Sequence, residues 1–134
     1  MENKWIIIRD EQMQDFLKNR NTNKLCCVYR WIVKDENNNI IEGYVGETSN
    51  FGLRIYEYRR NYTRHSLEKY KQSTDVIVYN KINEFIEKGF VVELQVMNGL
   101  CSERIKEKKY RLENEREGLL DLIQTTRKVW NKIN

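Results

Sequence analysis

The sequence contains no proline and only six glycines among 134 residues, so residues that break helices and strands are rare. It has a single histidine, His65, which excludes a histidine-rich metal site. The three cysteines, Cys26, Cys27 and Cys101, form no CxxC pair, and an odd count without metal-ligand spacing predicts reduced, mostly buried thiols.

Long hydrophobic runs are also missing, since no apolar stretch approaches the ~20 residues needed to cross a membrane. The run "WIIIR" near the start is too short for a signal peptide and is followed by acidic residues. These absences predict a cytoplasmic protein with no membrane partner. The length predicts one domain over residues 1–134, with a short N-terminal helical extension.

The hydrophobic pattern predicts an α+β fold: a small, mainly antiparallel three-stranded sheet flanked by helices. In the segment "CVYRWIV", apolar and aromatic side chains alternate between two faces, which is typical of a strand. The polar stretch "KDENNN" predicts the turn of a β-hairpin, and "NG" at 98–99 predicts another turn. The expected elements are helix 9–20, strands 24–33 and 40–47, helices 51–62 and 73–89, strand 90–97 and helix 102–124.

Positive charge is concentrated in one segment. Between Arg54 and Lys71 there are six basic and two acidic residues, an excess equal to the net charge of +4 of the whole chain. Four tyrosines are interspersed with these residues. Arginine neutralises phosphate and tyrosine stacks on bases, so the segment is typical of a nucleic-acid binder. A solvated basic helix face is the alternative interpretation of the charge alone.

Several short motifs share one order along the chain. Two predicted strands contain "CVY" (27–29) and "YVG" (44–46), and Arg54 follows Tyr44 by ten residues in "NFGLRI". Glu117 lies in "EGLLDLI", and the chain continues to "VWN" (129–131). This constellation resembles the GIY-YIG nuclease family, and most closely its compact phage-type and restriction-type endonucleases.

The resemblance implies a metal-dependent endonuclease that hydrolyses phosphodiester bonds of double-stranded DNA. It implies that Arg54 contacts the phosphate, that Glu117 holds Mg²⁺ or Mn²⁺, and that Tyr29 activates water while Tyr44 orients it. Cutting both strands with one site per chain implies a homodimer or larger homo-oligomer. The residues expected to contact DNA are Gly46, Arg59, Arg60, Arg64, Lys81 and Asn131.

The sequence departs from the family pattern at several positions. Cys27 replaces the first glycine, Tyr58 replaces a histidine that often follows the arginine, and the proline before the final asparagine is absent. The last departure leaves Glu113 as an alternative metal ligand, one helical turn from Glu117. The competing prediction is a catalytically inactive nucleic-acid-binding module with the same fold. Taken singly, Tyr29 and Tyr44 also fit ordinary cross-strand aromatic residues.

Overall fold

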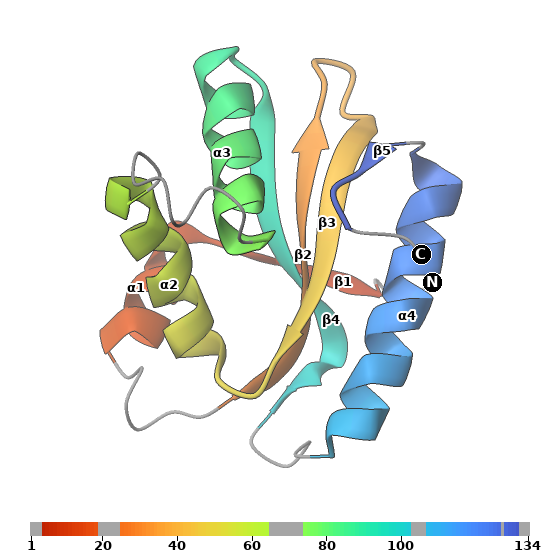
Figure 1. Ribbon diagram of the computed structural model, residues 1–134. Helices are drawn as coiled ribbons and strands as arrows, with labels where there is room; N and C mark the ends of the chain where they lie inside the picture. Colours follow the sequence, from red (N-terminus) through yellow and green to blue (C-terminus); the bar gives the residue numbers. More distant parts are fainter. Residues whose placement is uncertain (1–3, 19–24, 65–73, 103–106, 127, 132–134) are drawn as a thin grey trace.

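The computed structural model describes residues 4–18, 25–64, 74–102, 107–126 and 128–131, which form an α+β fold with a five-stranded, mostly antiparallel sheet and four helices (Figure 1). The strand order is β1-β4-β2-β3-β5. The elements are β1 (Trp5–Ile8), α1 (Asp10–Lys18), β2 (Cys26–Lys34), β3 (Ile40–Thr48), α2 (Phe51–Arg64), α3 (Thr74–Glu87), β4 (Val91–Ser102), α4 (Lys108–Thr125) and β5 (Lys128–Val129).

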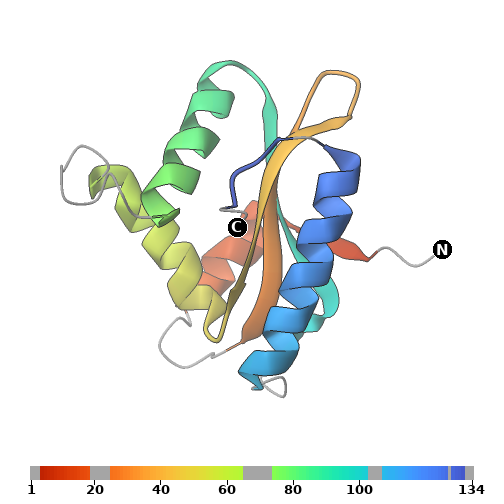
Figure 2. The same ribbon diagram turned by 45° about the vertical axis from the view of Figure 1, so that its right-hand side comes forward.

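Helices cover both faces of the sheet: α1, α2 and α3 lie on one side and α4 on the other (Figure 2). The predicted alternation along β2 sets this arrangement. Cys27, Tyr29 and Trp31 define the tyrosine face, whose buried cluster also contains residues of α1, α2 and α3. Val28 and Ile32 define the α4 face, where they pack with Leu122 of α4. Burying apolar side chains on both faces explains why the central strands are apolar almost throughout.

The predicted α+β class and the antiparallel β2–β3 hairpin are confirmed, but the prediction of three strands is wrong. β1 pairs antiparallel with β4, so the N-terminal part contributes an edge strand before the helix α1 and is not only a helical extension. β5 adds a parallel partner to β3, with Glu42 opposite Lys128. Both strands are too short to produce a periodic signal in the sequence.

The predicted turn at 98–99 is wrong, because both residues belong to β4. The register between β2 and β4 shifts between Cys27 and Tyr29, so β4 accommodates extra residues there. Such an irregularity needs glycine-like backbone freedom as a turn does, which explains the misleading signal. The last long helix starts at Lys108, later than predicted, and residues 103–106 lie outside the described ranges.

The predicted start of α2 at residue 51 is confirmed, and local contacts fix it. The Asn50 side chain accepts a hydrogen bond from the Leu53 backbone N–H at 3.0 Å, and the Thr48 hydroxyl bonds the Asn50 backbone at 3.1 Å. The first of these contacts satisfies a helix N–H group that has no partner within the helix.

The cysteine prediction is partly wrong. Cys26 is a buried free thiol, but Cys27 is disulfide-bonded, and Cys101 lies opposite it in the β2–β4 register. Within the described ranges, no helix is both long and apolar enough to span a bilayer.

Candidate active site

Tyr29 lies at the centre of the tyrosine face. Its side chain is 1% exposed, and its hydroxyl lies 2.9 Å from the hydroxyl of Tyr58 on α2. Its ring also packs against those of Tyr44, Phe51 and Tyr58, with centroid distances of 6.5, 6.0 and 6.1 Å. Aromatic pairs at these distances and tilts are favourable. Tyr29 is therefore held rigidly by residues of β3 and α2.

Gly46 lies directly opposite Tyr29 in the β2–β3 register, and the Tyr29 ring lies over its Cα atom. A side chain at position 46 would collide with this ring and approach that of Tyr44. Gly46 therefore makes room for two tyrosines within an extended strand. We expected Gly46 to contact DNA; its position in the structure gives it a packing role.

Arg54 lies in the first turns of α2, four residues before Tyr58. Residues four apart share one helix face, so Arg54 and Tyr58 are neighbours on α2. The Arg54 side chain is 28% exposed, and its Nη1 lies 3.4 Å from the carboxylate of Glu57. Sequence analysis noted Tyr58 only as a departure from the family pattern. Its spacing of four residues from Arg54 is the signal in the sequence that could have linked it to the site.

Tyr44 is half-buried on β3, near a broad groove between α3 and the β3–β5 edge. This groove has a volume of 820 Å³. The indole of Trp130 lies 6.3 Å from the ring of Phe85 and stacks on it. Both Tyr44 and Trp130 pack against the buried cluster of the tyrosine face. The charged residues lining the groove are Glu42, Lys81, Glu84, Lys88 and Lys128.

Lys81, which we expected to contact DNA, thus lines an open groove beside Tyr44. Among the other charges there, Lys88 bonds Glu84 at 2.9 Å, and this hydrogen bond and charge lower the pKa of the Glu84 carboxyl. Three lysines and two glutamates leave the groove weakly positive. A weak positive charge of this kind favours binding of a polyanion but does not identify which polyanion binds.

Asn131 has a well-defined structural contact. Its side-chain carbonyl accepts from the Val45 backbone N–H at 3.0 Å, and its amide donates to the Val45 carbonyl at 2.7 Å. The side chain thus continues the β5 pairing along the outer edge of β3, between Tyr44 and Gly46. This placement indicates a supporting role for Asn131; sequence analysis had assigned it to DNA contact.

The other predicted DNA-contacting residues are Arg59, Arg60 and Arg64. Their backbone belongs to the last turns of α2, but their side chains lie outside the described part of the structure. His65 and Lys71 lie outside the described ranges as well. The basic segment identified in the sequence is therefore placed only at its start, by Arg54.

Glu117 is exposed on α4. This helix covers the opposite face of the sheet from the one on which Tyr29 lies. Glu113, the alternative ligand, is exposed on the same helix. Within the described ranges, no group of three or more histidine, cysteine or acidic side chains could hold a metal ion. The residues as placed therefore do not fit a metal ion shared between Glu117 and the Tyr29–Arg54 region.

A different acid of α4 faces inward. Burial and, to a smaller degree, the nearby Glu47 carboxylate raise the pKa of Glu115 to about 7. Glu47 itself accepts a hydrogen bond from Arg111 Nε at 2.9 Å. Glu47 immediately follows the "YVG" motif but points to the α4 face. Sequence analysis did not single out Glu115, because the helical pattern of α4 was too weak to distinguish its inner from its outer acids.

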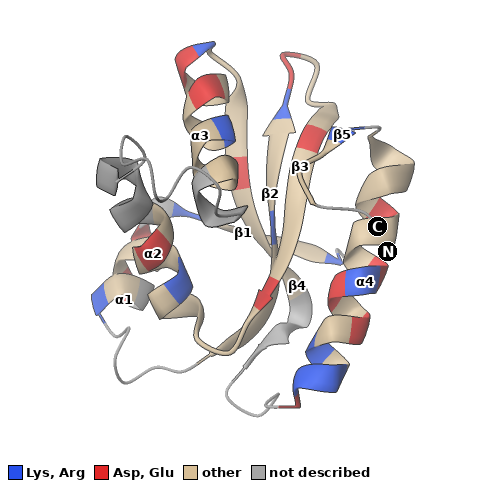
Figure 3. Cartoon of the chain, in the orientation of Figure 1, with Lys and Arg blue, Asp and Glu red and all other residues tan. Residues whose placement is uncertain are grey.

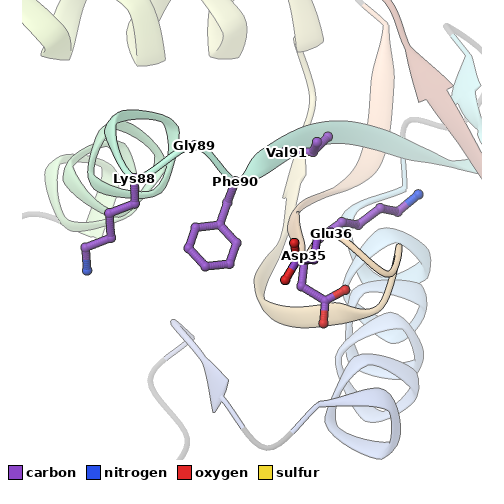
Figure 4. A pocket seen from close by; sticks show the side chains of 7 residues that line it. Asp35, Glu36, Lys88, Gly89, Phe90 and Val91 are labelled. Atoms are coloured by element: carbon purple, nitrogen blue, oxygen red, sulfur yellow. The ribbon is translucent and has the colours of Figure 1, made fainter.

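Two surfaces remain to be placed. Basic and acidic side chains are interspersed along α4, so this helix presents mixed charge (Figure 3). At the far end of the sheet, a cavity of 290 Å³ separates the "KDENNN" turn from the α3–β4 connection (Figure 4). Asp35 and Glu36 lie on one side of it, and Lys88 and Phe90 on the other. Neither surface adds a basic patch to the site.

Comparison of the chain with protein-family models, with curated proteins and with solved structures gives no match.

Proposed function

We propose that this protein is a DNA endonuclease of the GIY-YIG type, which hydrolyses phosphodiester bonds at the tyrosine face. One observation carries the proposal: the Tyr29 hydroxyl lies over Gly46 and contacts Tyr58, while Arg54 stands one helical turn from Tyr58. The two strand motifs and the arginine, distant in sequence, thus meet at one place. The ordering of the same residues supported the resemblance in the sequence.

Arg54 is suited to contact the scissile phosphate. Its guanidinium has five N–H donors in a planar fork, which matches phosphate oxygens better than an ammonium group does. Its contact with Glu57 is long and partly exposed, and such ion pairs contribute little to stability. A phosphate can therefore compete with Glu57 for Arg54. The charge that builds on the phosphate during hydrolysis would be met at this position.

The two tyrosine hydroxyls offer a place for the proton of the attacking water. A free tyrosine has a pKa of about 10, and a nearby cation favours the phenolate. If one hydroxyl of the Tyr29–Tyr58 pair loses its proton, the other can donate to the resulting phenolate. Because Tyr29 is 1% exposed, water reaches it only when the side chains that cover it move aside. Tyr44, which is half-buried, contacts the substrate without such a movement.

The groove next to Tyr44 gives a path for the DNA strand beyond the phosphate at Arg54. Lys81 and Lys128 line this groove from opposite sides, and the stacked Phe85 and Trp130 rings lie at its base. Lysines would neutralise adjacent phosphates and make binding sensitive to salt. Cleavage of both strands would use two copies of the chain, in keeping with the expected homodimer.

A catalytically inactive DNA-binding module is the second candidate. Two observations favour it: the Tyr29 hydroxyl is buried and engaged, and Glu117 is exposed on α4 at the other face of the sheet. We therefore derive no catalytic step through a metal ion. Dependence on Mg²⁺ or Mn²⁺ remains an expectation from the family resemblance.

Cleavage of supercoiled plasmid with and without Mg²⁺ or Mn²⁺ tests the proposal. We expect metal-dependent nicking by the wild type and a loss of at least about 100-fold in Arg54→Ala, a loss typical of removing one preorganised group that stabilises the transition state. Arg116→Ala, at an exposed arginine of α4, is the matched control. Cleavage that survives Arg54→Ala would contradict the proposal. DNA binding that weakens with salt, with no cleavage in any metal, would establish the inactive module instead.

The same assay tests the predicted metal ligand. Loss of cleavage in Glu117→Gln alone would support Glu117 as the metal ligand, even though its side chain lies on the other side of the sheet from Tyr29. Loss of cleavage in Glu113→Gln instead would identify Glu113 as the metal ligand, one helical turn before Glu117. Both side chains are exposed, so either substitution should leave the free energy of unfolding within about 0.5 kcal/mol of the wild type.

A further inference from the structure

Arg30 is a buried arginine on the α4 face of the sheet, opposite the tyrosine face. Its side chain is 7% exposed, and its Nε donates a hydrogen bond to Gln95 Oε1 at 2.7 Å. Its guanidinium carbon lies 4.3 Å above the ring of Trp5, an arrangement that favours a cation. Trp5 is held in turn by Asp121 of α4, at 3.3 Å from the indole nitrogen.

The charge of Arg30 is only partly compensated. Within the described residues, its two terminal nitrogens form no hydrogen bond and no ion pair, and the side chain lines an open cavity. Burial lowers the pKa of Arg30 to about 10, although Asp121 and Glu93 oppose this effect through space. Arg30 thus stays protonated at neutral pH, and its side chain is one of those that line the cavity. A buried charge is expensive unless it is paired, so a bound anion would stabilise it.

The cavity beside Arg30 has a volume of 610 Å³ and is lined mainly by residues of β1, β2 and β4. Three more cations line it: Lys4, Arg9 and Lys34. No acidic side chain lines it, although Glu93 lies close by and pairs with Lys34 at 3.1 Å. Glu93 also accepts a hydrogen bond from Gln95, and this orients the Gln95 carbonyl toward Arg30. The partly exposed Ile6 and Ile7 of β1 supply apolar lining.

We propose that this cavity is a phosphate-binding site, which holds the phosphate of a nucleotide or of a nucleic-acid strand against Arg30. A guanidinium with free donors suits phosphate oxygens, and four cations exceed what the two nearby carboxylates, Glu93 and Asp121, would neutralise. The volume of 610 Å³ leaves room for the attached nucleoside, and the exposed Ile6 and Ile7 side chains offer it apolar contacts. The site lies on the opposite sheet face from Arg54, and it requires no cleavage activity.

Calorimetric titration of the full chain with defined probes tests this site. The phosphate probes are inorganic phosphate, adenosine monophosphate and a short oligodeoxythymidylate; adenosine and glutarate are the uncharged and dicarboxylate controls. We expect saturable binding of phosphate probes only, with a shift of the Trp5 indole N–H resonance. Arg30→Gln should weaken this binding by about tenfold or more, the usual effect of losing a charge-assisted hydrogen bond. Arg116→Ala, at an exposed arginine of α4 outside the cavity, should leave binding of the monophosphate unchanged.

A second variant avoids the core. Lys4→Ala combined with Arg9→Ala changes two exposed cavity residues and should weaken binding several-fold, whereas Lys18→Ala with Lys109→Ala removes the same charge elsewhere and should not. Tight binding of the monophosphate would identify a site for one terminal phosphate, and tight binding of the oligonucleotide alone a site for a strand. The proposal is overturned if no phosphate probe binds, if glutarate binds as tightly, or if both cavity variants bind like the wild type.

Discussion

A Cβ atom at residue 46 would lie 2.6 Å from the hydroxyl oxygen of Tyr29 and 2.7 Å from its Cζ atom. Real Cβ atoms do not approach other atoms so closely, so any side chain at Gly46 must displace the Tyr29 ring. The ring has no free space to enter, since it already contacts Phe51 and Tyr58. Gly46 and Tyr29 therefore depend on each other, although they belong to different strands.

The first prediction follows from this contact. Gly46→Ala should lower the free energy of unfolding by about 1–3 kcal/mol, the usual effect of overpacking a core. Urea denaturation measures the change. Arg116→Ala, at an exposed position of α4, is the control and should leave the free energy of unfolding within about 0.5 kcal/mol of the wild type. Equal stability of Gly46→Ala and wild type would show that the Tyr29 ring lies elsewhere.

A second prediction concerns the hydrogen bond between Tyr29 and Tyr58. Tyr29→Phe and Tyr58→Phe should each lower the free energy of unfolding by about 1 kcal/mol, since each removes the hydrogen bond between the two buried hydroxyls. The double variant should lower the free energy of unfolding by less than the sum of the two single variants, because it removes both hydroxyls. Strict additivity in this double-mutant cycle would mean that the hydroxyls do not interact.

The dependence of stability on pH provides a third prediction. The pKa of Glu115 is about 7 in the folded chain and 4.5 in a model compound, so the folded state binds the proton more tightly. Stability from this group is therefore full below about pH 4.5 and declines as the pH rises to about 7. Glu115→Gln should remove this decline and stabilise the protein at pH 8 relative to wild type, on the order of 1 kcal/mol for a partly exposed side chain.

Urea denaturation at pH 5 and pH 8 measures this difference. Two nearby groups face Glu115 from β3 and α4, the Glu47 carboxylate and the Arg111 guanidinium that pairs with it. Glu117→Gln is the matched control, because Glu117 is exposed on the same helix. A wild type and a Glu115→Gln variant with identical pH profiles would contradict a raised pKa.

A fourth prediction addresses Asn131. Its amide makes two hydrogen bonds to the backbone of Val45, so Asn131→Ala should lower the free energy of unfolding by about 1–2 kcal/mol. Asn131→Asp should lower the free energy of unfolding further, because a carboxylate has no donor for the Val45 carbonyl that it would face. Thermal or urea unfolding of the three proteins gives the order. An aspartate variant as stable as wild type would argue against this pairing.

The central hairpin was predictable because its side chains alternate along β2, and one face of each strand must be buried. The same alternation placed Tyr29 and Trp31 together on one face, and the spacing of four residues links Arg54 to Tyr58. The contact between Tyr29 and Tyr58 was not predicted, because Tyr58 stood out in the sequence only as a departure from the family pattern.

Other features depend on contacts that no local pattern encodes. β1 has only four residues, and pairing with β4 makes it a strand. The role of Gly46 follows from a ring on another strand, and that of Asn131 from the backbone of Val45. For the acids of α4, the packing of Gly118 against Trp5 sets which side faces the sheet. That contact turns Glu115 inward and leaves Glu117 in solvent.

The β3–β5 pairing also bears on how the chain reaches its native state. Residues 128–131 close an edge of the sheet whose other strand, β3, lies in the first half of the chain. Contacts over such a separation in sequence form late, since a long loop must close before they contribute. Until then, β3 presents unpaired backbone groups to any other extended chain. Once residues 128–131 pair with β3, this edge can no longer pair with a second chain. The pairing therefore limits self-association during folding.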